Sequence, residues 1–252
     1  MLFFLFLNLV LSFKTTAYFG VFDESYNITM KNPNDIPWNK FDRLIVSFAN
    51  IDEHGNITNE RSEDEPRMKK VISLYRKANP KGEVFASIYD ERYERFLYAA
   101  NHSDNYYKSA IKYIKKYQLD GLDLDWETYL INTYSDQLVT LLKVCHGKFK
   151  ITHAVWPSVH DPKTVGLLAN VVDQINIMSY GFSISMVEYL INSYNQSGFP
   201  YSKMVLGMES ETKDETQEII NGKIELVKKY NLAGIFLWRL DNDPEFKTVK
   251  MF

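Results

Sequence analysis

Positions 120–127 read Asp-Gly-Leu-Asp-Leu-Asp-Trp-Glu, and the last three acidic residues of this run alternate with apolar residues. In a β-strand, alternate side chains share a face, so Asp123, Asp125 and Glu127 point one way while the leucines and the tryptophan point the other. Carboxyl groups two residues apart leave the backbone about 6.6 Å apart. Burial and mutual repulsion then raise the pKa of at least one of them, so the set holds a proton near neutral pH. The pattern predicts general acid chemistry, with Glu127 at the carboxyl end of the strand as the proton donor.

A divalent metal ion bound by the three carboxylates is the alternative use of this cluster. An EF-hand calcium loop needs glycine at its sixth position, where counting from Asp123 places Thr128. The five histidines, at positions 54, 102, 146, 153 and 160, show no pairing at the spacing of metal ligands. We therefore expect that the protein uses no metal and no cofactor.

The acidic run is one of eight short runs rich in β-branched and aromatic residues, which are predicted strands. They cover 18–22, 43–51, 83–89, 121–127, 150–156, 174–180, 203–208 and 234–240. Between most of them, apolar residues recur at helical spacing over 66–79, 104–117, 132–146, 183–196 and 212–230. Eight βα units in about 235 residues predict a (β/α)8 TIM barrel of the α/β class. The competing doubly wound sheet lacks its signature, because no GxGxxG follows the first strand.

The first 17 residues are interpreted as a secretory signal, which leaves 18–252 as the catalytic barrel. Residues 2–13 form an apolar run that is too short to span a bilayer, and polar residues follow it at once. Four Asn-x-Ser/Thr sequons, at Asn27, Asn56, Asn101 and Asn195, are typical of a secreted glycoprotein. No later segment approaches the length of an apolar membrane span. We expect an extracellular protein.

Composition excludes several partners and chemistries. Among 252 residues, 29 basic and 32 acidic side chains give a net charge of −3, without the basic surface that a nucleic acid requires. Cys145 is the only cysteine, so the chain has no internal disulfide and no thiolate zinc cluster. We expect Cys145 to be a buried thiol and the protein to be a monomer.

The run 120–127 resembles the DGxDxDxE signature of glycoside hydrolase family 18, to which many chitinases belong. Four further segments are similar to family strands in the same order. They are Tyr-Phe-Gly-Val-Phe at 18–22, Leu-Ile-Val-Ser-Phe-Ala-Asn at 44–50, Asn-Ile-Met-Ser-Tyr at 176–180 and Gly-Ile-Phe-Leu-Trp at 234–238. The resemblance therefore spans the whole predicted barrel.

This resemblance implies a retaining glycosidase whose substrate supplies the nucleophile. Glu127 would protonate the glycosidic oxygen, and the N-acetyl carbonyl of the substrate would attack the anomeric carbon. Asp125 and Tyr180 would hold the acetamide, and Asp123 would tune Asp125 from below. Trp238 would form the floor of the −1 sugar subsite, in a pocket that is lined by Tyr18, Phe48 and Met178. The implied substrate is chitin or another oligosaccharide of N-acetylglucosamine.

The sequence departs from the family pattern at three places. The third strand reads Ser87-Ile-Tyr-Asp90 where the family often has Ser-x-Gly-Gly, and Gly181 stands where many relatives carry Asp. Positions 207–234 have room for one helix, so we expect no α+β insertion domain and an open cleft. Aromatic residues that could stack on sugars at its rim are Tyr89, Tyr93, Tyr129 and Trp156.

Two other functions remain open. An endo-β-N-acetylglucosaminidase would use the same chemistry on the chitobiose core of N-glycans. A lectin-like relative would bind chitin without cutting it, although such members lack the proton donor that Glu127 supplies here.

Overall fold

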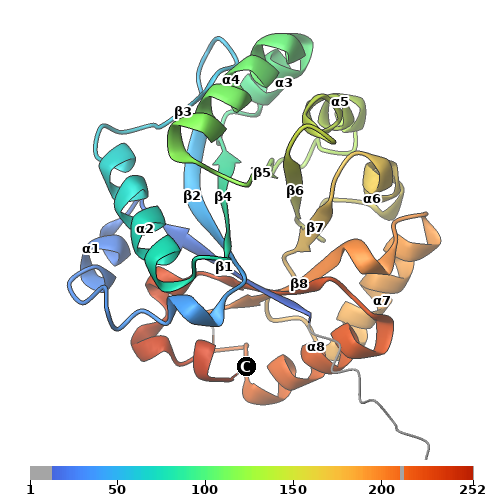
Figure 1. Ribbon diagram of the computed structural model, residues 1–252. Helices are drawn as coiled ribbons and strands as arrows, with labels where there is room; N and C mark the ends of the chain where they lie inside the picture. Colours follow the sequence, from blue (N-terminus) through green and yellow to red (C-terminus); the bar gives the residue numbers. More distant parts are fainter. Residues whose placement is uncertain (1–12, 211–212, 252) are drawn as a thin grey trace, which may run out of the picture.

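The computed structural model describes residues 13–210 and 213–251, and eight parallel strands in it close into a barrel (Figure 1). The sheet order is β1-β9-β8-β7-β6-β5-β4-β2, and β1 also pairs with β2. The predicted (β/α)8 barrel is therefore confirmed. The strands are β1 (Lys14–Gly20), β2 (Arg43–Ile51), β4 (Glu83–Tyr89), β5 (Gly121–Asp125), β6 (Lys150–Val155), β7 (Gln174–Ile177), β8 (Met204–Glu209) and β9 (Gly234–Trp238).

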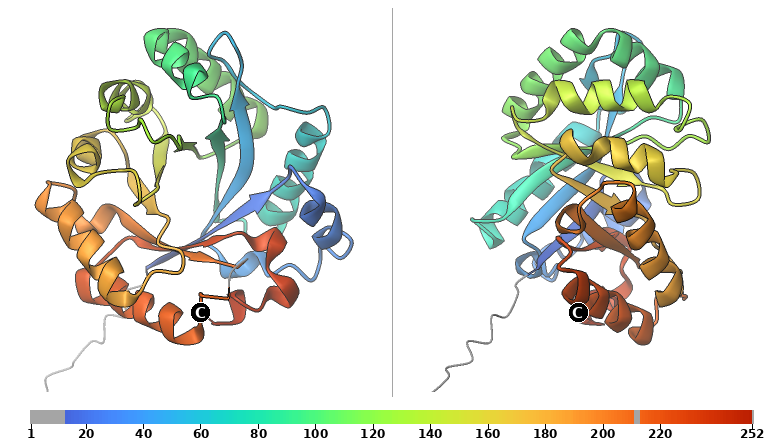
Figure 2. Two further views of the ribbon diagram at one scale, coloured as in Figure 1. Left: turned by 180° about the vertical axis from the view of Figure 1, so that it is seen from behind. Right: turned by 90° about the vertical axis from the view of Figure 1, so that its right-hand side faces the viewer.

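Helices surround the strands, as the views from behind and from the side show (Figure 2). Five lie where helical periodicity predicted them: α2 (Asp64–Ala78), α4 (Ser103–Tyr117), α5 (Ser135–Cys145), α7 (Ile184–Gln196) and α8 (Gln217–Tyr230). Three shorter helices were not predicted, namely α1 (Glu24–Thr29), α3 (Tyr93–Asn101) and α6 (Pro162–Leu167). With six to nine residues each, they offer too few turns for an apolar period to stand out.

Smaller elements complete the chain. A two-residue strand, β3 (Ile57–Thr58), pairs antiparallel with the end of β2. The 3-10 turns are η1 (Trp38–Lys40), η2 (Leu168–Asn170), η3 (Tyr201–Lys203), η4 (Leu240–Asn242), η5 (Pro244–Phe246) and η6 (Val249–Met251). Between β8 and β9, the part of the chain that is described contains only α8, which agrees with the predicted absence of an insertion domain.

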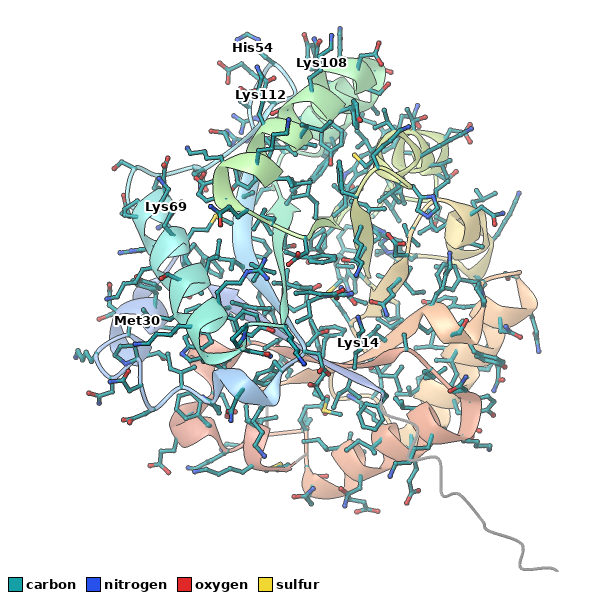
Figure 3. The ribbon with its side chains drawn as sticks, in the orientation of Figure 1. Lys14, Met30, His54, Lys69, Lys108 and Lys112 are labelled. Atoms are coloured by element: carbon teal, nitrogen blue, oxygen red, sulfur yellow. The ribbon has the colours of Figure 1, made fainter. Side chains whose placement is uncertain are left out.

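The barrel has two apolar layers. Leu122, Leu124 and Trp126 belong to the large cluster between strands and helices, where the Trp126 ring stacks on Phe96 with centroids 5.0 Å apart. A separate cluster inside the barrel is formed by Tyr18, Ile45, Phe85, Val205 and Phe236. Charged residues such as Lys69, Lys108 and Lys112 project outward from the helices (Figure 3). The predicted two-faced pattern of the acidic strand is therefore confirmed.

Several strands differ from the prediction at their ends. β5 ends at Asp125 and β7 at Ile177, so Glu127 and Tyr180 follow the last paired residues instead of lying within strands. The last ladder partners in these two strands are Asp125, which pairs with Tyr89, and Ile177, which pairs with Val155. Sequence periodicity continues past that point, so it cannot locate the end of a ladder.

β1 begins at Lys14, four positions earlier than expected, because Lys14 and Thr16 pair with Gly234 and Phe236 of β9. The polar residues at 14–16 lie at the end of the barrel where the strands start. A cleavage after Ala17 would fall inside β1. Residues 2–12 of the apolar run lie outside the described residues, so the signal peptide stays a prediction. In the described part of the chain, no helix is long and apolar enough to cross a membrane.

Candidate active site

A cavity of about 520 Å³ opens at the mouth of the barrel where the parallel strands end. It contains seven of the eight side chains that the sequence singled out, and Asp123 lies beneath it. Its lining consists of Tyr18, Phe48, Tyr89, Asp125, Glu127, Ala154, Trp156, Ser158, Met178, Tyr180, Phe182, Phe236 and Trp238. Carboxyl and aromatic groups thus converge on one site.

Asp123 is fully buried below the cavity and accepts four hydrogen bonds. The Tyr18 hydroxyl (2.9 Å) and Ser87 Oγ (2.8 Å) donate to its Oδ2. Thr152 Oγ1 (2.6 Å) and Asn176 Nδ2 (3.1 Å) donate to its Oδ1. Burial raises the pKa of Asp123, and these donors offset part of that rise because they favour the ionised form.

The roles of Thr152 and Asn176 were missed by the sequence analysis. Ser87 and Thr152 lie beside Asp123 in the registers of β4 and β6, so the three polar groups occupy one layer of the barrel interior. The available signal was a polar residue at an inward position of an otherwise apolar strand.

Asp125 lies in the next layer, and Glu127 follows just beyond the end of β5; both side chains line the cavity. Asp125 is 4% exposed, and its Oδ1 has no hydrogen-bond partner among the described residues. Burial raises the pKa of Asp125 well above its usual range, and the neighbouring charges of Glu127 and Asp123 add to this effect. Burial also raises the pKa of Glu127. The buried Asp125 and the partly buried Glu127 cannot both be ionised at low cost, so the pair retains a proton.

Tyr180 faces the same pair from the loop after β7. Its pKa is raised well above 10.0 by burial and by the negative charges of Asp125, Glu209 and Glu127. The hydroxyl therefore stays protonated and can donate a hydrogen bond into the cavity.

Aromatic rings form much of the rest of the cavity wall. The Trp238 ring stacks on Phe48 with centroids 5.7 Å apart and meets the edge of Tyr18 at 5.5 Å. Phe48 also packs against Phe22 (5.3 Å) and Tyr89 (5.1 Å). A rigid apolar surface of this kind suits the flat face of a sugar ring.

The four rim aromatics fall into two groups. Tyr89 and Trp156 line the cavity, and Tyr129, which is 79% exposed, lies against Trp156 with ring centroids 5.2 Å apart. Tyr93 is not among the lining residues and stacks on Tyr134 instead, at 5.9 Å. Tyr93 thus packs against a neighbouring tyrosine, and sugar contact by the rim aromatics stays a prediction.

The departures from the family pattern have visible consequences. In the segment 87–90, Ser87 donates to Asp123, Tyr89 lines the cavity, and the buried Asp90 is paired with Arg92 and Arg95. A bulky side chain, Tyr89, therefore forms part of the cavity wall at this segment, and the narrower cleft stays a prediction.

Two of the five histidines form a hydrogen-bonded pair that their spacing in the sequence did not indicate. His153 and His160 are both buried, and their Nε2 atoms are 3.1 Å apart. His153 Nδ1 lies 2.7 Å from the carbonyl oxygen of Leu124 and donates to it, and the Trp156 amide donates to His160 Nδ1 at 3.2 Å. Both rings are then neutral, and the His160 Nε2 proton joins them. Burial lowers the pKa of His153 to about 3 and that of His160 to about 4. No group of three or more candidate metal ligands occurs within the described residues.

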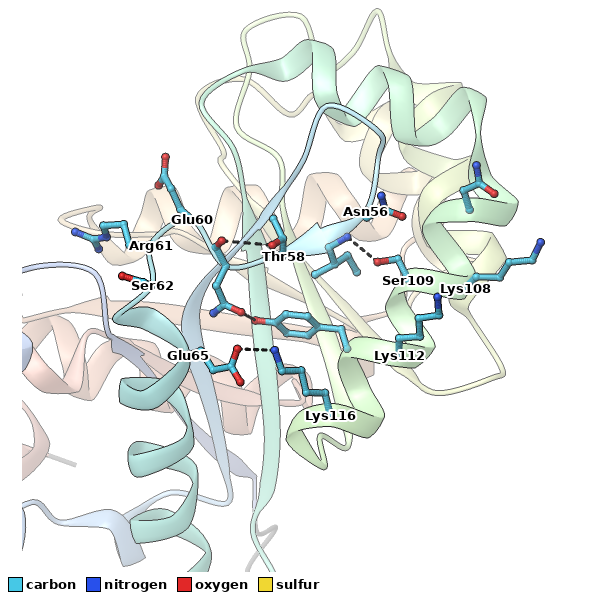
Figure 4. Close-up of a pocket in the computed structure, with 14 residues that line it drawn as sticks. Asn56, Thr58, Glu60, Arg61, Ser62, Glu65, Lys108, Ser109, Lys112 and Lys116 are labelled. Carbon is cyan, nitrogen blue, oxygen red and sulfur yellow. Dashed lines mark hydrogen bonds and ion pairs between the residues drawn. The ribbon is translucent and has the colours of Figure 1, made fainter.

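A second cavity, of about 700 Å³, lies outside the barrel between α4, the segment after β3 and the start of α2 (Figure 4). Its lining is polar, and Lys116 is paired with Glu65 across it at 2.5 Å. None of the residues of the acidic strand reaches it. The chemistry is therefore assigned to the cavity at the barrel mouth.

Comparisons with known proteins agree with this fold. The chain is 23% identical over 248 residues to endochitinase 1 of Metarhizium robertsii, and the match covers 75% of this chain and 57% of that protein. The chain thus spans little more than half the length of this curated relative.

Two solved structures share the fold. One is a mutant class V chitinase from Nicotiana tobaccum in complex with NAG4, with TM-score 0.78 and 17% identity, covering 95% of this chain and 97% of that one. The other is a chitinase-like agglutinin from Robinia pseudoacacia, with TM-score 0.76 and 16% identity, covering 94% of this chain and 97% of that one.

The match to a family profile is broader. It extends over residues 14–218, from the first residue of β1 into the start of α8, and so includes the acidic strand and the loop that carries Tyr180. The chain belongs to glycosyl hydrolases family 18.

Proposed function

We propose that this protein hydrolyses the β-1,4 bonds of N-acetylglucosamine polymers such as chitin. The observation that carries the proposal is the pair of adjacent carboxyl groups, the buried Asp125 and the partly buried Glu127, with raised pKa values in a cavity that has an aromatic wall. Such a pair keeps a proton available near neutral pH. Family membership and the relative that binds NAG4 support a chain of N-acetylglucosamine as the substrate.

In the first step, Glu127 donates its proton to the glycosidic oxygen, and the bond from that oxygen to the anomeric carbon breaks. The carbonyl oxygen of the substrate's own acetamide attacks the anomeric carbon, which forms an oxazolinium ring. Asp125 accepts a hydrogen bond from the acetamide N–H, and Tyr180 donates one to the acetamide oxygen. The negative charge of Asp125 then stabilises the positive charge that develops on the ring.

In the second step, the Glu127 carboxylate takes a proton from water, and the water oxygen attacks the anomeric carbon. The oxazolinium ring opens and restores the acetamide. Two inversions at one carbon give overall retention. Asp123 supports this cycle from below, because its fixed charge keeps the proton on the Asp125–Glu127 pair.

Glu127→Gln tests the assignment. The amide keeps the shape of the side chain and removes the acidic proton, so the rate on a tetramer of N-acetylglucosamine should fall by about 10³-fold or more. Calorimetry should show unchanged tetramer affinity. A variant that kept the wild-type rate would exclude Glu127 as the donor.

An endo-β-N-acetylglucosaminidase is the second candidate, and the short β8–α8 connection favours it. Without an insertion domain, few sugars are enclosed on either side of the bond that is cut, which suits the two-sugar core of an N-glycan. Mass spectrometry on a high-mannose glycopeptide beside the tetramer separates the two functions. Release of the glycan far faster than tetramer cleavage would favour the glycan core.

A binding protein without catalysis is the third candidate, since the Robinia pseudoacacia relative is an agglutinin. Glu127 and Asp125 side by side in the cavity argue against it. Tetramer binding without any cleavage would support it.

We also propose that the protein is secreted, glycosylated and monomeric, and that it needs no cofactor. Support comes from the predicted signal segment and from the exposure of two sequon residues, Asn27 and Asn101. Mass spectrometry of the protein from a eukaryotic host, before and after treatment with an amidase that removes N-glycans, tests the modification.

A further inference from the structure

Lys223 is a charged residue in an unusual place, because it is fully buried although it does not line the cavity. It lies on α8, which packs beside β8 (Figure 1). Its Nζ donates to the carbonyl oxygens of Ser179 (2.9 Å) and Gly207 (2.7 Å) and to Glu215 Oε1 (2.6 Å). All three ammonium protons are therefore used.

The partner of Lys223 contacts the same loop. Glu215 Oε1 also accepts a hydrogen bond from the Gly181 amide at 2.9 Å. One buried ion pair thus binds the carbonyl of the residue before Tyr180 and the amide of the residue after it. Gly181 has φ +64, a conformation that favours glycine and turns its amide toward Glu215.

Tyr180 needs such support because no strand ladder holds it. β7 ends at Ile177, and the next helix, α7, begins only at Ile184. The Tyr180 ring meets Phe236 edge-on with centroids 6.0 Å apart, and the position of its backbone depends on contacts of the loop, where the ion pair holds the residues on both sides of the tyrosine.

Burying the Lys223–Glu215 ion pair between α8 and the loop after β7 costs free energy. Moving two charged groups out of water carries a penalty of several kcal/mol per ion, and apolar residues of similar volume often give equal or greater stability. Burial lowers the pKa of Lys223, and the charge of Glu215 opposes that shift. A role in positioning accounts for the charges better than packing does.

We propose that Lys223 and Glu215 act as positioning residues that set the Tyr180 hydroxyl against the Asp125–Glu127 pair. The inference rests on the proposed glycosidase function, to which it adds two residues outside the cavity. Neither residue lines the cavity, and both act through the backbone of residues 179–181.

The test uses the full chain with both charges replaced, K223M/E215L, so that no unpaired buried charge remains. We expect kcat on the N-acetylglucosamine tetramer to fall about 10- to 100-fold with KM within about twofold of wild type. E215Q keeps the acceptor oxygen and should retain most of the rate. K228M, an exposed lysine on the same helix, is the matched control and should leave kcat unchanged.

A second arm asks whether the loss passes through Tyr180. In a Tyr180→Phe background, K223M/E215L should lower kcat by less than about threefold, because the hydroxyl that it positions is already absent. An equal loss in both backgrounds would overturn the proposal, since it would show a general structural effect.

A crystal structure of K223M/E215L separates this inference from the proposed function. If wild type does not cleave the tetramer but Tyr180 is displaced in the variant, the function is wrong and the positioning role stands. If Tyr180 keeps its place in the variant, the positioning role is wrong whatever the activity.

Discussion

Asp123 and Asp125 leave the same face of β5, yet their carboxyl groups have opposite surroundings. Four donors surround Asp123, whereas Oδ1 of Asp125 has no partner within the described residues and a second carboxyl group, Glu127, lies beside it. The negative charge is therefore held at Asp123 and the proton is held one layer higher. The proposed chemistry requires this arrangement, because Glu127 needs a proton to donate to the glycosidic oxygen.

The donors to Asp123 should be measurable in stability. Thr152→Val removes the 2.6 Å hydrogen bond with little change of shape. We expect urea denaturation to show a free energy of unfolding lower by about 1–3 kcal/mol, because a buried carboxylate loses a donor. Thr140→Val on the outer helix α5 is the control and should change little. Equal stability of Thr152→Val and wild type would show that this contact contributes nothing.

The pH profile of kcat should depend on the coupled carboxyl groups of Asp125 and Glu127. Activity requires a protonated Glu127, so it is lost as pH rises through the raised pKa of the pair. Asp125→Asn removes the neighbouring charge, so the remaining carboxyl loses its proton more easily. We expect the basic limb of the residual activity to move to lower pH. A basic limb that stayed at the same pH or moved to higher pH would show that the charge of Asp125 does not raise the pKa of Glu127.

The faces of the barrel could be predicted from the sequence because they follow from alternation along one strand. Leu122, Leu124 and Trp126, which alternate with the acids of the run 120–127, point to the helices, as expected. The contacts that cross the barrel could not be predicted, because they depend on register between distant strands. Asn176 donates to the Tyr18 hydroxyl across a separation of 158 positions. Nothing local to either residue indicates that contact.

The histidine pair was missed for a different reason, which is local. His153 belongs to β6 and His160 precedes α6, and only the turn between them brings the rings together. Sequence spacing can test helical metal-ligand patterns, but it cannot detect a turn that folds back on a strand.

The His153–His160 pair predicts how the free energy of unfolding changes as pH falls. Both pKa values are depressed from 6.5, to about 3 for His153 and about 4 for His160, so the unfolded chain takes up protons first. The contribution of the pair is present above pH 6.5 and is lost as pH falls toward 4. His153→Gln should flatten the dependence of unfolding free energy on pH in this window. His54→Gln, at an exposed site, should not alter it, and an unchanged slope in His153→Gln would refute the assignment.

The most direct measurement compares two tetramers that differ only in the acetyl group. Wild-type protein is incubated with a tetramer of N-acetylglucosamine and, separately, with a tetramer of glucosamine, and the products are followed by mass spectrometry. Substrate assistance through Asp125 and Tyr180 predicts cleavage of the acetylated tetramer, mainly to dimers, and no cleavage of the other. Equal rates on both tetramers would contradict the account.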